Sequence, residues 1–140
     1  MARTHLSPNF KLEFDSCMTG FHVYMKKWRP VEGQTLYCDV DKRLEAKVHD
    51  PTSVGIYTET KQLVGHVPRE FSHALHKFIG KNRNVVHVHV TGEKYNAGKK
   101  GLVLPCRYSC ASFLWSNKND LRKELVKSDV TTTSKKIIFN

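Results

Sequence analysis

The chain has 140 residues, 39% of them hydrophobic and 10% aromatic, which suits one folded domain and is too polar for a membrane protein. It carries 23 lysines and arginines against 13 aspartates and glutamates, a formal net charge of +10. No apolar run approaches the roughly 18 residues of a membrane-spanning helix, and the first residues do not resemble a secretory signal. We therefore expect a soluble, intracellular protein.

The basic excess lies entirely in the second part of the chain. Residues 1–60 hold 8 basic and 8 acidic side chains, whereas residues 61–140 hold 15 basic and 5 acidic ones. Such a one-sided balance favours a polyanionic partner, most often nucleic acid, because each neutralised phosphate releases condensed counterions. The alternative is that the lysines only keep a surface soluble, and charge alone leaves both interpretations open.

The first half of the chain predicts short strands. Residues 1–15 show no sustained period and are expected to form a loose N-terminal lead-in. Residues 16–25 are rich in aromatic and β-branched side chains and predict a first strand, with Gly20 as a bulge. Alternation continues in three further segments, the last two forming a hairpin: residues 34–41, 52–58 and 62–66.

One helix is clearly indicated after these strands. Pro68 suits a first-turn position, and Phe71, Leu75 and Phe78 recur at helical spacing. Gly80 follows directly and is a typical residue at a helix end. The sequence therefore predicts an amphipathic helix that ends at Gly80.

The remaining segments predict two more strands and a C-terminal helix. Residues 84–91 alternate without interruption, and residues 102–112 form a second long alternating segment. Leu121 and Leu125 indicate a short amphipathic helix, followed by a basic, flexible tail at residues 128–136.

This order of elements predicts a fold that is mainly β with some α. We expect a small, OB-like, partly open β-barrel of about six strands with one or two helices. The chain is divided into a lead-in (residues 1–15), a β-barrel domain (16–112) and a C-terminal short helix with its basic tail (113–140).

Catalytic and metal-binding patterns are missing from the sequence. It contains no G-x-S-x-G, H-E-x-x-H or P-loop motif and no Cys-x-x-Cys pair. His73 with His76, or His87 with His89, has the spacing of a metal pair, but no carboxylate or thiolate supports either one. We expect no enzyme activity, no cofactor and no metal, and four reduced core cysteines. A nuclease or metal-assisted hydrolase ranks as the last alternative.

A binding motif stands where the predicted hairpin meets the predicted helix. His66 and Arg69 flank the start of the helix, where free backbone N–H groups favour an anion. Arg69 adds a guanidinium group that binds phosphate with two hydrogen bonds. The structural alternative is that Gly65 only permits a close approach and Pro68 only begins the helix.

The order of several motifs resembles the HIRAN domain over roughly residues 16–112. The most specific of these motifs is the run from Val64 to Arg69. The match is closer to stand-alone HIRAN-like proteins than to the helicase-linked module. The motifs are Gly20-Phe21-His22-Val23-Tyr24, Trp28-x-Pro30-x-x-Gly33, Leu36-x-Cys38, Asp50 followed by Val54-x-Ile56, and Val64-Gly65-His66-Val67-Pro68-Arg69.

The resemblance implies an OB-like barrel that binds DNA. In the DNA-repair helicase of the family, the pocket captures a single-stranded 3′ end between two stacking rings. Carried over by position, Asp50 matches the carboxylate that receives the 3′-hydroxyl, His66 the pocket histidine and Arg69 a phosphate-binding lysine. His22 replaces a basic residue on the first strand.

The sequence departs from the family pattern at both stacking rings. These positions hold Val23 and His49, with Tyr24 adjacent to the first, and the loop between the strands carries Arg43 and Lys47. Because stacking contributes about 1–3 kcal/mol per base, the loss of two rings weakens end capture more than phosphate binding. We therefore expect the protein to bind nucleic acid but do not expect it to be specific for a 3′ end.

The leading prediction is a non-catalytic, nuclear module that binds single-stranded DNA or DNA ends. Four of its predicted contact residues, Lys94, Tyr95, Lys99 and Lys100, form a flexible clamp in the loop before residue 102. The predicted contact residues are His22, Tyr24, Arg43, Lys47, His49, Asp50, His66, Arg69, Lys94, Tyr95, Lys99 and Lys100. The alternative is a protein-interaction or scaffold module that kept the fold and lost the pocket.

Overall fold

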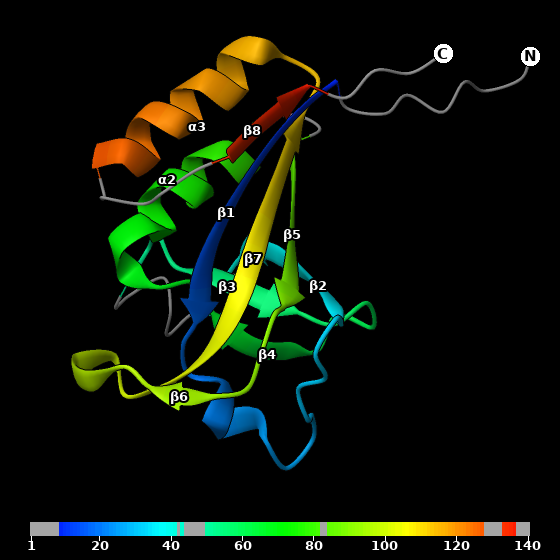
Figure 1. Cartoon of the computed structure of the whole chain (residues 1–140), viewed down its shortest axis with the longest axis vertical. Coiled ribbons are helices and arrows are strands. Elements are labelled where there is room, and N and C mark those ends of the chain that lie inside the picture. Colours follow the sequence, from blue (N-terminus) through cyan, green and yellow to red (C-terminus); the bar gives the residue numbers. More distant parts are fainter. Residues whose placement is uncertain (1–8, 42, 44–49, 82–83, 128–132, 137–140) are drawn as a thin grey trace, which may run out of the picture.

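The computed structural model describes residues 9–41, 43, 50–81, 84–127 and 133–136, and within them the chain forms one antiparallel sheet and two α-helices (Figure 1). The strands follow the order β4-β3-β2-β5-β7-β1-β8, and the short β6 pairs with β7 outside this path. The strands are β1 (Phe10–Met18), β2 (Thr35–Val40), β3 (Val54–Tyr57), β4 (Leu63–His66), β5 (Val85–Val90), β6 (Tyr95–Asn96), β7 (Leu102–Ser112) and β8 (Thr133–Lys136). The helices are α2 (Arg69–Ile79) and α3 (Trp115–Lys127), with 3-10 turns η1 (Phe21–Tyr24) and η2 (Gly98–Lys100).

The sheet is strongly twisted and stays open. In Figure 1 the long strands β1, β7 and β5 run along the long axis, and β2, β3 and β4 cross the lower half. The strand ladders do not close into a barrel; an isolated bridge links Thr19, just after β1, to His66 in β4 through two backbone hydrogen bonds of 2.9 Å. The prediction of a mainly β, partly open fold is confirmed, with seven strands in the main path instead of about six.

The core lies between the sheet and α2. Phe14 and Tyr108 stack with ring centroids 5.1 Å apart, and Phe71 of α2 packs edge-on against both. The Tyr108 hydroxyl donates a 2.7 Å hydrogen bond to the carbonyl oxygen of Cys17, so this fully buried phenol has a partner. The helix ends before Gly80, as its apolar spacing predicts.

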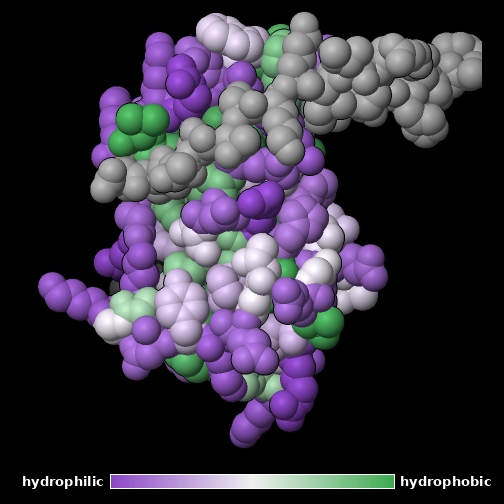
Figure 2. All heavy atoms as spheres, viewed as in Figure 1, coloured by the Kyte–Doolittle hydropathy of each residue, from purple (hydrophilic) through white to green (hydrophobic). Residues whose placement is uncertain are grey.

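Helix α3 packs on α2 and on the sheet through its two leucines. Leu121 and Leu125 are 3% and 0% exposed, which confirms the predicted amphipathic helix. Polar side chains link the two helices at their rims, where ion pairs join Lys77 to Glu124 and Lys81 to Asp120. Hydrophilic side chains also cover most of the face seen in Figure 2.

The predicted first strand at residues 16–25 is wrong. Strand β1 begins at Phe10 and ends at Met18, so it crosses the predicted boundary at residue 15. Gly20 has φ +72°, which turns the chain into η1, and the fully buried Phe21 holds that turn against the core. The alternation of β1 is obscured in the sequence because Glu13, on the face opposite Leu12, is also buried.

The predicted flexible tail also needs correction at its end. Residues 133–136 form β8, which pairs antiparallel with the first four residues of β1, from Phe10 with Lys136 to Glu13 with Thr133. The sequence of β8 is polar and shows no apolar period. A strand can form there without one, because pairing with an open strand edge needs only backbone N–H and C=O groups. The division of the chain at residues 15 and 112 stays a prediction.

The cysteines are free thiols, as expected. Cys17, Cys106 and Cys110 are buried and Cys38 is half-buried. Burial raises the pKa of Cys106 to about 12, and it raises the pKa of the other three thiols as well. All four are therefore protonated side chains at neutral pH.

Candidate nucleic-acid interface

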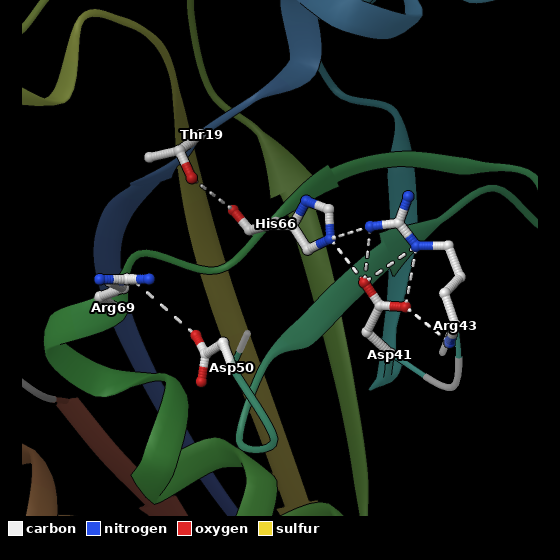
Figure 3. Close-up of polar contacts among 6 residues, drawn as sticks. All are labelled: Thr19, Asp41, Arg43, Asp50, His66 and Arg69. Atoms are coloured by element: carbon white, nitrogen blue, oxygen red, sulfur yellow. Dashed lines mark hydrogen bonds and ion pairs between the residues drawn. The ribbon is translucent and has the colours of Figure 1, made fainter. Parts of the chain in front are cut away.

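A glycine, Gly65, allows the end of β4 to lie close to the end of β1. A Cβ atom added to Gly65 would lie 2.7 Å from the Met18 sulfur and 3.2 Å from the carbonyl oxygen of Thr19. The first distance is shorter than real Cβ contacts and the second is tight, so a larger residue at position 65 would press on Met18 and on the backbone of Thr19. The bridge between Thr19 and His66 follows directly, and it fixes the backbone from which the imidazole projects (Figure 3).

A buried carboxylate joins His66 to Arg43. The Asp41 side chain is completely buried, and its Oδ2 lies 2.8 Å from His66 Nε2 and 2.9 Å from an Arg43 guanidinium nitrogen. The Arg43 backbone N–H and Nε both donate to Oδ1 of the same carboxylate at 3.1 Å. Burial alone would raise the pKa of Asp41, but the hydrogen bonds from Arg43 and His66 outweigh it and lower the pKa to about 2.

This contact assigns the two ring nitrogens of His66 different roles. Because the carboxylate only accepts hydrogen bonds, Nε2 carries a proton and donates it to Asp41. Nδ1 is the nitrogen on the Gly20 side, 3.8 Å from where a Cβ on Gly20 would be. With the proton on Nε2, Nδ1 is the ring nitrogen that can act as a hydrogen-bond acceptor toward a ligand.

Asp50 and Arg69 form a second pair beside the first. Oδ1 of Asp50 accepts hydrogen bonds from the backbone N–H and the hydroxyl of Thr52, which fixes the turn before β3. Oδ2 lies 3.9 Å from Nε of Arg69, whose side chain is 85% exposed at the start of α2. Together they border a shallow depression of about 280 Å³ that Ser72 and His73 also line.

The predicted residues Asp50, His66 and Arg69 thus come from distant parts of the chain to one region. In Figure 3 Arg69 points toward Asp50, whereas His66 points toward Asp41. The lining of the Asp50–Arg69 depression does not include His66. The arrangement is two adjacent polar clusters, each with one arginine and one carboxylate.

The predicted clamp residues lie in or next to the hairpin of β6 and β7, whose connection contains η2. Tyr95 is 48% exposed, and the side chains of Lys94 and Lys99 are exposed as well. Lys100 instead forms an ion pair with Glu70 in the first turn of α2, and this hydrogen bond raises the pKa of Lys100. The hairpin is therefore tied to α2 one residue from Arg69.

The remaining predicted contact residues are His22 and Tyr24, which lie in η1, and Lys47 and His49. His22 is exposed and Tyr24 half-buried, and both belong to the 3-10 turn instead of a strand. Val23, at a stacking position of the HIRAN pattern, is 69% exposed. Lys47 and His49 lie outside the described residues.

The sequence interpretation did not single out Asp41 or Tyr57. The Tyr57 ring lies across Gly55, since a Cβ on Gly55 would be 2.8 Å from the phenol oxygen. Burial raises the pKa of Tyr57, and the nearby Asp41 and Asp39 raise it further. The available signals were weak: Tyr57 alternates with the core residue Ile56, and Asp41 is a single acidic residue after a strand.

The histidines of the second predicted metal pair, His87 and His89, make contacts with neighbouring side chains. His87 packs edge-on against Tyr37 at 5.1 Å, and His89 shares a 3.1 Å hydrogen bond with the Thr35 hydroxyl. Over the part of the chain that the structure describes, no three histidine, cysteine or acidic side chains are placed to hold a metal ion. No helix in that part has the length and apolar character needed to span a bilayer.

Comparison with known proteins identifies the fold. No family model and no curated protein matches the sequence. The structure is similar to the crystal structure of the HIRAN domain of human HLTF, with a TM-score of 0.62 at 14% sequence identity. The match covers 86% of this chain and 93% of that one. The chain therefore has a HIRAN-like fold.

Proposed function

We propose that this protein is a non-catalytic module that binds single-stranded nucleic acid or DNA ends, with the two polar clusters at the β4–α2 connection as its contact surface. The observation that carries the proposal is the side-by-side placement of Asp41–His66–Arg43 and Asp50–Arg69. The HIRAN-like fold and the basic excess after residue 60 support it.

Each cluster offers a different chemistry to the ligand. Arg69 is almost fully exposed beside the free backbone N–H groups at the start of α2, which together favour a phosphate. Arg43 is 43% exposed and is already oriented by Asp41, so it binds a second phosphate with little loss of side-chain entropy. The carboxylate of Asp50 is the group that the HIRAN resemblance assigns to a terminal 3′-hydroxyl.

In this proposal the module is a binder and not an enzyme, as the HIRAN-like fold suggests. The same resemblance suggests a nuclear location and a role in DNA repair. Val23 and His49 stand where the HIRAN pattern has its two stacking rings. Specificity for a 3′ end is therefore tested separately from binding itself.

Binding is tested by fluorescence anisotropy with a labelled single strand at about 50 and about 200 mM salt. We expect affinity to fall steeply with salt, since each neutralised phosphate releases counterions. Arg69→Ala and Arg43→Ala should each weaken binding and reduce the salt slope. Lys77→Ala is the matched control, because Lys77 lies on the same helix as Arg69 and pairs with Glu124 of α3.

End specificity is tested with strands that carry a 3′-hydroxyl or a 3′-phosphate. Preference for the hydroxyl that disappears in Asp50→Ala would support end capture. Absent or salt-insensitive binding by the intact protein would contradict the proposal and favour a protein-interaction module. The feature that would then serve a protein partner is the pair Leu114 and Trp115, which are 58% and 54% exposed.

A further inference from the structure

A groove lies on the solvent face of β2 and β3, next to the Asp41–His66–Arg43 cluster. It has a volume of about 540 Å³, and Tyr37, Tyr57, Asp39 and Lys61 are among its lining residues. We propose that this β2–β3 groove binds unpaired bases of the nucleic-acid strand, with Tyr57 and Tyr37 as stacking rings. The inference rests on the proposed function and narrows its ligand to a single strand.

The two tyrosines are placed side by side by strand register. Tyr37 and Tyr57 are direct cross-strand partners, so their side chains leave the same face of the sheet. Both rings are half-buried, and Tyr37 is braced by an edge-on contact with His87 at 5.1 Å. Rings held in this way lose little freedom when a base stacks on them.

The groove is continuous with the cluster around His66. Gly55 pairs with His66 on one side and with Asp39 on the other, which puts all three on the face that carries Tyr57. The Tyr57 ring lies across Gly55 and so extends from the groove toward His66. A base stacked on Tyr57 therefore has its phosphate within the reach of the Arg43 cluster.

The tyrosine chemistry suits a nucleobase next to phosphate. The phenol of Tyr57 is uncharged at physiological pH, since its ordinary pKa is 10.0 and burial raises that pKa further, so the ring does not repel the strand. Aromatic rings stack on any unpaired base, whereas the bases of a duplex cover one another's faces. Tyr57 and Tyr37 would thus supply the stacking that Val23 does not provide at the position of the HIRAN pattern.

Two carboxylates in the groove indicate which bases fit. Asp39 is exposed, and its Oδ1 accepts a 2.8 Å hydrogen bond from the backbone N–H of Val40; Glu59 lies at the turn after β3. Carboxylates accept hydrogen bonds from exocyclic amino groups such as N4 of cytosine. We therefore expect cytosine to be preferred over thymine, with the phosphates directed toward Arg43 and Lys61.

The test uses the whole chain and strands of about ten nucleotides, a length that one OB-type surface accommodates. The strands are all-dC, all-dT and an abasic strand of equal length. Tyr57→Leu and Tyr37→Leu should each weaken binding of the dC strand about tenfold or more and leave the abasic strand unchanged. Tyr57→Phe keeps the stacking face and should recover most of the affinity for dC that Tyr57→Leu loses. Asp39→Ala should remove the preference for dC over dT.

The outcomes separate this inference from the proposed function. If the unaltered protein binds no strand at low salt, the proposed function fails and the groove assignment fails with it. If it binds but both folded leucine variants bind dC normally, the groove is not a base site while the function stands. Equal weakening of the dC and abasic strands would show a merely structural role. A short arginine-rich peptide that binds the parent but not Tyr57→Leu, with strand binding unchanged, would assign the groove to a basic protein segment instead. Should Tyr57→Leu fail to fold, Tyr37→Leu with Tyr57→Phe decides the question.

Discussion

His66 Nε2 lies 2.8 Å from Oδ2 of Asp41, a carboxylate whose side chain is completely buried. The two residues are 25 positions apart in the sequence, and no local pattern indicates that they meet. The contact orients the imidazole and the neighbouring Arg43 before any ligand arrives. Stability, pH dependence and binding should therefore all respond to changes at this cluster.

Asp41→Asn should destabilise the fold by about 1–3 kcal/mol, because it removes a charged acceptor that holds His66 and Arg43. The measurement is urea-induced unfolding at neutral pH. Asp39→Asn is the matched control, since Asp39 is an exposed carboxylate near the end of β2, two residues before Asp41. An equal effect of the two substitutions would contradict the importance of the buried contact.

The stability of the protein should fall in acid through Asp41. The folded pKa of about 2 is below the ordinary value of 3.8, so its contribution is fully present above about pH 4 and is lost as the pH falls through 2. The contribution is at most about 2 kcal/mol, because Arg43 is partly exposed to water. Unfolding curves between about pH 5 and 2 check this, and Asp41→Asn should flatten the profile. Asp15, whose pKa Arg107 lowers, is the second carboxylate to replace in a control variant.

Gly65→Ala should cost about 1–3 kcal/mol, since the added methyl group would press on Met18 and on the carbonyl oxygen of Thr19. Gly80→Ala is the control at a position where a Cβ makes ordinary contacts and φ is −66°. We expect that control to be neutral or to stabilise by about 0.4–1 kcal/mol. Thermal or urea unfolding of both variants gives the comparison, and similar values for the two would be inconsistent with the close approach of β1 and β4.

Glu70→Gln should strengthen nucleic-acid binding several-fold while changing stability by less than about 1 kcal/mol. The substitution frees Lys100 and removes a negative charge one residue from Arg69. Anisotropy at low salt measures the effect, which should shrink as salt increases. Unchanged or weaker binding would place the ligand away from the start of α2.

The thiols should react slowly in the native protein. Burial raises the pKa of all four cysteines, to about 12 for Cys106, and the thiolate is the reactive form. A colourimetric thiol reagent at pH 8 should modify the three buried thiols, Cys17, Cys106 and Cys110, only after a denaturant is added. Rapid labelling of Cys106 in the native state would contradict its burial.

Much of the fold was predictable because its elements follow local rules. The helix that ends before Gly80 and the long strand at residues 102–112 have apolar residues at the spacing that one buried face requires. The hairpin of β3 and β4 follows from two short alternating segments with a polar turn. The first strand and β8 were not predictable in the same way, because their positions depend on pairing with strands far along the chain.

The candidate site was likewise predictable in its residue types but not in its contacts. The residue types of Asp50, His66 and Arg69, and their resemblance to the HIRAN pattern, are legible in the sequence, and the structure puts them in one region. Sequence order carries no information about which carboxylate meets which cation. The structure pairs Asp41 with His66, lays Tyr57 across Gly55 and ties Lys100 to Glu70. Such contacts arise from the twist and register of a sheet that brings together residues from distant strands. Local periodicity therefore fixed the kinds of elements, and long-range packing chose the partners within the site.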